Sequence, residues 1–209
     1  MKPVSEKNLA ARLNNLNERI ASACRASGRS SEAITLIGIS KTKPAEDVAA
    51  AHALGLKDFG ENYLQEASGK IDALEGLAAT WHYVGKIQSN KTKEVAKYFD
   101  WVHTVDRNKI AQRLNAQCPT DKIIQVLIQV NIDEDPNKGG CSPEEILNLA
   151  QQMMLLPRIQ MRGLMTILSK DSTPRDGYES VAQLFTVIAA KLPAVQQRCW
   201  DTLSMGMTD

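Results

Sequence analysis

The sequence predicts an α/β protein with a parallel β-sheet, either open and doubly wound or closed into a (β/α)8 barrel of the TIM type. Short apolar runs that suit buried strands alternate with stretches of helical period along the whole 209 residues. Polar residues collect after most of the predicted strands, where parallel α/β proteins place their ligands. We expect a single domain over residues 1–209, because one compact core is usual at this length.

A predicted helix at about residues 5–27 opens the chain. Its apolar residues recur at helical spacing, and Gly28 is typical of a helix end. Residues 34–39 then form a short apolar run that suits a strand buried on both faces. After this run, Pro44 and Gly55 bound an alanine-rich stretch, which is the usual order of proline at a helix start and glycine at its end.

Six further strands are predicted, with helical stretches between them. Their ranges are 57–60, 81–85, 101–105, 123–132, 159–167 and 200–205. The clearest helix begins at Ser142, where a following proline and Glu145 complete a capping box. Another helix carries Val181 and Ile188 on one apolar face. Seven strands are one fewer than a closed barrel requires, so we expect an open sheet or a barrel without its eighth strand.

The composition excludes several classes of partner. The net charge is only +1, whereas proteins that bind nucleic acid or anionic membranes usually carry a basic excess. The sequence has no signal-peptide pattern and no long apolar run, so we expect a cytoplasmic protein. Its 4 cysteines are scattered without metal or redox spacing, which predicts reduced, structural thiols.

Lys41 directly continues the first predicted strand. An unpaired ammonium is costly to bury, and desolvation lowers the pKa of a lysine, so the neutral amine becomes available to attack an aldehyde. Such a lysine can hold a carbonyl cofactor as a Schiff base. A structural alternative is favoured on spacing alone: a lysine that reaches solvent from the strand end or pairs with Glu61.

Other polar positions have equally ordinary explanations. His82 and His103 lie within predicted strands, where a core histidine bonded to the backbone is the simplest reading, and they lack metal-ligand spacing. The basic run at residues 86–97 suits a solvated helix face, with contact to an anion as the alternative. Residues 204–208 form either a tight turn or a cradle in which backbone N–H groups approach a phosphate.

Seven short motifs occur in a recognisable order. They are residues 39–44 (ISKTKP), 59–66 (FGENYLQE), 81–91 (WHYVGKIQSNK), 103–106 (HTVD), 129–132 (QVNI), 162–165 (RGLM) and 203–207 (LSMGM). Together they closely resemble the pyridoxal phosphate homeostasis protein family over essentially the whole chain. This resemblance implies a TIM-type (β/α)8 barrel of PLP fold type III, like the N-terminal domain of alanine racemase.

The resemblance also implies a cofactor, pyridoxal 5′-phosphate (PLP), and a set of residues that hold it. Lys41 would carry PLP as an internal aldimine. Asn62 and His82 would lie near the cofactor, while Ser204 and Gly206 would help to hold its phosphate. The implied function is intracellular PLP, or vitamin B6, homeostasis without robust catalysis. The resemblance further implies a monomer that delivers its cofactor to apo PLP enzymes.

Two alternatives stay open at this point. One is a PLP-dependent racemase-like or decarboxylase enzyme on the same barrel, although such enzymes add a β-domain for which we find no sequence here. The other is an interaction scaffold without cofactor. The family pattern continues into an eighth strand with an Arg-x-Gly…Phe-Gly motif that this sequence lacks. We therefore expect a truncated chain with unpaired sheet edges and weakened PLP affinity.

Overall fold

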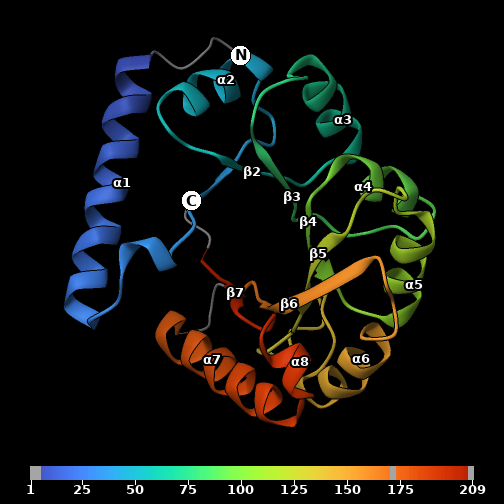
Figure 1. Ribbon diagram of the computed structural model, residues 1–209. Coiled ribbons are helices and arrows are strands. Elements are labelled where there is room, and N and C mark those ends of the chain that lie inside the picture. The colour runs from blue at the N-terminus through green and yellow to red at the C-terminus, as the bar shows by residue number, and fades with distance from the viewer. Residues whose placement is uncertain (1–5, 170–172, 207–209) are drawn as a thin grey trace. The chain divides into compact units, whose positions relative to one another are not determined.

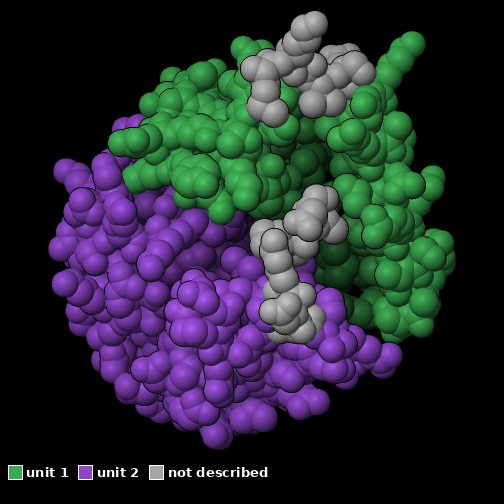
Figure 2. Space-filling view, turned by 180° about the vertical axis from the view of Figure 1, so that it is seen from behind, with its two compact units in different colours: residues 1–81 green, residues 82–209 purple. Residues whose placement is uncertain are grey.

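The computed structural model describes residues 6–169 and 173–206 of the chain (Figure 1). The chain divides into two compact units, with the boundary between residues 81 and 82, and Figure 2 gives each unit its own colour. The division falls inside strand β3 (Thr80–Tyr83). The single domain expected from the length stays a prediction.

The first unit contains three α-helices, one 3-10 helix and two complete strands within its described part. They are α1 (Glu6–Ser27), the short 3-10 helix η1 (Ser31–Ala33), β1 (Ile37–Ile39), α2 (Ala45–Ala53), β2 (Asp58–Glu61) and α3 (Leu64–Ala73). Strands β1 and β2 pair in parallel, with Ile37 opposite Asp58 and Ile39 opposite Gly60. The predicted first helix is confirmed from Glu6 onward, and Ser5 lies outside the described residues.

Strand β1 differs from its prediction in length and in burial. Ile34 donates its backbone N–H to the carbonyl of Ser31 and so closes helix η1, which removes the start of the apolar run from the strand. The predicted burial on both faces is wrong, because Ile39 is 43% exposed and no residue of β1 is fully buried. A three-residue strand at the end of the strand order has too few neighbours to be covered on both faces.

The second unit alternates strands and helices from the remainder of β3 onward. Its further elements are α4 (Thr92–Tyr98), β4 (Trp101–Val105), α5 (Asn108–Gln117), β5 (Ile124–Gln129), η2 (Pro143–Glu145), α6 (Ile146–Met153), β6 (Ile159–Met165), α7 (Pro174–Lys191), α8 (Ala194–Gln197) and β7 (Thr202–Ser204). Strands β3 to β7 are neighbours in chain order, and their pairings are parallel. The described residues thus contain seven strands, and the parallel α/β prediction is confirmed.

The core of this unit forms around β4, β5 and β6. Ile124, Val126, Leu127 and Ile128 of β5 are all 0% exposed, as expected for a parallel strand covered on both faces. Figure 1 shows α5, α6 and α7 along one side of these strands, and their apolar faces complete the cover. Burial of each such aliphatic side chain contributes roughly 1.5–3 kcal/mol.

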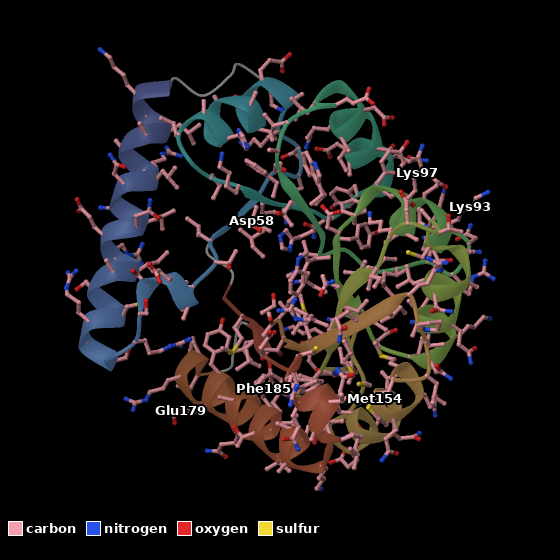
Figure 3. The ribbon with its side chains drawn as sticks, viewed as in Figure 1. Asp58, Lys93, Lys97, Met154, Glu179 and Phe185 are labelled. Carbon is pink, nitrogen blue, oxygen red and sulfur yellow. The ribbon has the colours of Figure 1, made fainter. Side chains whose placement is uncertain are left out.

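The ends of the helices follow the local signals of the sequence. The capping box before α6 is confirmed, because the backbone N–H of Ser142 donates to Glu145 Oε2 at 2.8 Å. The predicted apolar face of α7 is confirmed by the burial of Val181 and Ile188. Phe185, labelled in Figure 3, belongs to the same helix and stacks on Trp200 with 5.3 Å between ring centroids.

All four cysteines are free thiols in the structure, and three of them are buried. Within the described residues, no helix is both long enough and apolar enough to cross a lipid bilayer.

Candidate functional site

Lys41 lies on an exposed turn directly after β1. Within the described residues, its ammonium group makes no hydrogen bond or ion pair. The prediction that Lys41 continues a buried strand is wrong, because β1 ends at Ile39 and the turn carries the lysine into solvent. The structural alternative holds in its first form, because Lys41 reaches solvent from the strand end. Its second form, a pair between Lys41 and Glu61, is wrong, since Glu61 bonds to other groups. Lys41 is therefore an accessible amine.

The backbone before Lys41 is fixed by a buried cluster. Ser40 is 6% exposed, and its Oγ donates to Glu61 Oε1 at 2.6 Å. Its carbonyl oxygen accepts a hydrogen bond of 2.7 Å from the ammonium of Lys70. Lys70 also forms an ion pair with Glu61, whose side chain is 0% exposed. An ammonium and a carboxylate can share this interior because each neutralises the other.

The backbone after Lys41 is held from the same helix. The N–H of Thr42 donates to Glu66 Oε1 at 2.5 Å, and Glu66 pairs with Lys70 at 3.1 Å across one turn of α3. Thr42 itself has a φ of 63°, a left-handed conformation that is uncommon for a side chain branched at Cβ. Both peptide neighbours of Lys41 are thus anchored, while its own side chain stays free.

Asn62 follows β2 and is half-buried. Its Oδ1 and the Oε2 of Glu61 are buried acceptors without a hydrogen-bond partner among the described residues. Buried acceptors are nearly always paired, so each of these atoms has capacity for a donor from a ligand or a water. The first unit therefore offers a free amine at Lys41 and unused acceptors that follow one another in the chain.

In the second unit, two histidines and a serine form a hydrogen-bonded line. His82 Nδ1 lies 2.9 Å from His103 Nε2, and His103 Nδ1 lies 2.8 Å from Ser204 Oγ. Their strands are β3, β4 and β7. The simple reading of a histidine bonded to the backbone is therefore wrong for His103, since both of its ring nitrogens bond to side chains.

The ring of His103 is neutral at physiological pH. Burial lowers its pKa to about 3, and repulsion by a charge on His82 adds to the effect. A neutral imidazole has one N–H donor and one acceptor nitrogen. His103 therefore donates to one neighbour of the line and accepts from the other.

An aromatic stack fixes the ring of His82. His82 stacks on Trp101 with 5.7 Å between centroids and an interplanar angle of 20°. The guanidinium of Arg162 lies 4.9 Å above the same indole ring. Arg162 is in turn held by Asp201 through two hydrogen bonds, of 3.0 and 2.6 Å. The stack leaves His82 little freedom to rotate away from His103.

Close contact between β6 and β7 positions Ser204. Gly163 has a φ of 150°, and a Cβ built on it would lie 2.0 Å from the carbonyl oxygen of Thr202. Glycine is thus required for β7 to pair with β6, where Ser204 lies opposite Met165.

Gly206, also predicted to hold a phosphate, is exposed and has a φ of 86° with open space around it. Its neighbours Met207 and Thr208, which belong to the predicted cradle, lie outside the described residues. The basic run is the solvated helix face expected, because Lys93 and Lys97 are exposed on α4 and point away from the strands (Figure 3).

The structure thus brings His82 and Ser204 together through His103, and it places Lys41 and Asn62 at the ends of neighbouring strands of the first unit. Sequence reasoning missed Lys70, although its spacing of four residues from Glu66 on a predicted helix was a usable signal. No group of three His, Cys, Asp or Glu side chains that could hold a metal occurs within the described part of the chain.

Comparison with known proteins identifies the family. The family described as alanine racemase, N-terminal domain, matches residues 11–209. A pyridoxal phosphate homeostasis protein of Pseudomonas aeruginosa is 43% identical over 202 residues, covering 96% of this chain and 86% of the relative. The protein of the same name from Escherichia coli K12 is 41% identical over 208 residues, covering 96% and 87%.

Solved structures agree with this family. PipY of Synechococcus elongatus PCC7942, solved with PLP bound, has 33% identity and a TM-score of 0.74, covering 92% of this chain and 89% of its own. Alanine racemase of Corynebacterium glutamicum shares the fold, with 13% identity, a TM-score of 0.66 and coverage of 92% and 52%. The resemblance and the fold predicted from seven motifs are thereby confirmed. This chain belongs to the pyridoxal phosphate homeostasis protein family, with the fold of the alanine racemase N-terminal domain.

Proposed function

We propose that this protein binds PLP and serves intracellular vitamin B6 homeostasis, with the cofactor held covalently on Lys41. Relatives named pyridoxal phosphate homeostasis proteins and the PLP-bound structure of PipY support the proposal. The observation in this chain that carries it is Lys41, an exposed amine without a partner among the described residues, on a turn anchored at both sides. Condensation of this amine with an aldehyde releases one water and is reversible.

The chemistry of the other four residues suits the same cofactor. When bound, PLP supplies an aldehyde, an aromatic ring and a phosphate. Asn62 has an unused buried acceptor, and His82 presents a ring held rigidly by Trp101. Ser204 and Gly206 offer a hydroxyl group and a backbone N–H, which are typical donors to a phosphate.

We further propose that the protein stores and transfers PLP without robust turnover. The charged groups that anchor the Lys41 turn, Glu61, Glu66 and Lys70, are engaged in mutual ion pairs, which suits a structural role better than proton transfer. The exposure of Lys41 leaves the covalent link accessible for release to an acceptor. Apo PLP enzymes as acceptors, a monomeric state and a cytoplasmic location belong to this proposal.

The test is to trap the covalent link. The protein is incubated with PLP, reduced with borohydride and analysed by peptide mass spectrometry. We expect a pyridoxyl group on Lys41, its loss in Lys41→Ala, and its retention in the matched control Lys43→Ala. An adduct that persists elsewhere at full yield in Lys41→Ala would contradict the assignment. Steady turnover of free amino acids by the loaded protein would contradict the carrier function.

A further inference from the structure

The hydrogen-bonded line from His82 to Ser204 can run in either of two directions. In the first, His103 Nε2–H donates to His82 Nδ1, and His103 Nδ1 accepts the hydroxyl proton of Ser204. In the second, His82 Nδ1–H donates to His103 Nε2, and His103 Nδ1–H donates to Ser204 Oγ. The heavy-atom distances of 2.9 and 2.8 Å suit both directions.

The two directions give Ser204 different properties toward a ligand. In the first, the hydroxyl proton is used inside the protein, so Ser204 offers an incoming group only lone pairs. In the second, Ser204 Oγ accepts from His103 and its proton is free to turn outward. When the direction changes, the N–H hydrogen of each imidazole moves from Nε2 to Nδ1. The total number of protons is unchanged.

A phosphate ester distinguishes between these two states. Its oxygens only accept hydrogen bonds when it is a dianion, so they repel a Ser204 that presents lone pairs and bind one that presents a proton. Because His103 is 2% exposed, breaking its bond to Ser204 would leave a buried ring nitrogen without a partner, which is costly. The tautomer of His103 therefore sets the donor capacity of Ser204.

We propose that a phosphate ester bound at Ser204 selects the Nδ1–H tautomer of His103, which acts as a positioning residue by turning the Ser204 hydroxyl toward the phosphate. This inference rests on the proposed PLP function and adds to it a device for selecting phosphorylated over unphosphorylated vitamers. It also links the phosphate to His82, whose Nδ1 becomes a donor when the line reverses.

The rigidity of the surroundings makes such selection effective. His82 is stacked on Trp101, and the close contact at Gly163 fixes the strand that carries Ser204. With these three side chains held in place, a ligand changes the positions of the protons in the line rather than the positions of the side chains.

The direct test is the tautomer state of His103 by nitrogen-15 NMR on the full chain. The chain has 3 histidines, and spectra of a His52→Gln variant remove the signal outside the line. Two samples are compared, one loaded with PLP and one with pyridoxal, which lacks the phosphate. We expect protonated Nδ1 and unprotonated Nε2 on His103 with PLP, and a smaller share of this tautomer with pyridoxal.

The outcomes separate this inference from the proposed function. Borohydride reduction of the same samples reports whether Lys41 has captured the aldehyde. An adduct on Lys41 with equal His103 tautomers for the two ligands would overturn the inference alone. An adduct with His103 as the Nε2–H tautomer in the PLP sample would also overturn it. Failure of any adduct to form would overturn the proposed function and this inference together.

A second measurement separates positioning from a merely structural role. In His103→Gln we expect the affinity for PLP to fall about tenfold or more, the usual cost of losing a hydrogen bond to a charged group, with the affinity for pyridoxal unchanged. In the control His52→Gln both affinities should stay unchanged. An equal loss for both ligands in His103→Gln would indicate damage to the fold and contradict the positioning role.

Discussion

The ammonium of Lys70 donates a hydrogen bond to the carbonyl oxygen of Ser40 at 2.7 Å, so a buried lysine holds the turn that presents Lys41. The same ammonium pairs with Glu61 beneath that turn. Lys70 is thus buried and paired, and it holds the turn on which Lys41 is exposed and has no partner among the described residues.

Removal of one partner of this buried pair should be strongly destabilising. Lys70→Met leaves the carboxylate of Glu61 buried at 0% exposure without its counter-charge. We expect a loss of about 3–5 kcal/mol in the free energy of unfolding, measured by urea denaturation. The double variant Lys70→Met with Glu61→Gln should recover part of the loss. A loss below about 1 kcal/mol in the single variant would contradict a buried, interacting pair.

The buried His103 should make the protein less stable in mild acid. Its folded-state pKa of about 3 lies below the ordinary value of 6.5, so between these values the unfolded chain binds a proton that the folded chain does not. This contribution is fully present above pH 6.5 and is lost as the pH falls toward 3. From pH 7 to pH 5 we expect a fall of about 2 kcal/mol from this residue.

Urea denaturation at the two pH values measures this fall, and His103→Gln removes the titrating group. The variant should lose less stability than the wild type over the same interval, although its stability at pH 7 is lower. Equal pH dependence of the two proteins would show that His103 is not neutral in the folded state.

Gly163 should not tolerate a side chain. In Gly163→Ala the added Cβ would meet the carbonyl of Thr202, so β7 must move away from β6. We expect a loss of about 2 kcal/mol or more in unfolding free energy, together with weaker PLP binding because Ser204 moves with β7. The matched control is Gly69→Ala in α3, where nothing lies within 4 Å of the added Cβ. This control should gain up to about 1 kcal/mol.

The cysteines should differ in reactivity according to their burial. Burial raises the pKa of Cys141 to about 12, so little thiolate forms at pH 8. Cys199 is half-buried, whereas the other three cysteines are buried. With a thiol reagent we expect Cys199 to react first in the native protein, and all 4 to react after unfolding. Rapid labelling of Cys141 in the native protein would contradict its burial.

Local sequence signals were sufficient for much of the fold. The apolar run at residues 101–105 coincides with β4, and the capping box before α6 forms as predicted. The predicted strand at residues 123–132 is longer than β5, because Val130 forms only an isolated bridge and Asn131 closes a turn with Asp135. The apolar pattern of the sequence predicts where the interior of a strand lies. The ends of a strand depend on how far the neighbouring strands offer hydrogen-bond partners, which the local sequence does not show.

The candidate site was predictable in part. The motifs pointed to Lys41, Asn62, His82, Ser204 and Gly206, and the family that they indicate is confirmed. The physical reason that the sequence suggests for Lys41, desolvation in a buried strand, is wrong. The accessible amine and the buried ammonium are two different lysines, Lys41 and Lys70, and their spacing in the chain does not reveal which is which.

The sequence by itself determined the order of strands and helices, the family and the chemical character of the candidate ligand residues, because these follow from short motifs and local periodicity. Only the tertiary structure decided that Lys70 supports the Lys41 turn. It also decided that His103 bonds both to His82 and to Ser204, which lies 101 positions after His103 in the chain. Such contacts depend on which strands become neighbours and on what is buried between them, and burial also decides which groups stay charged.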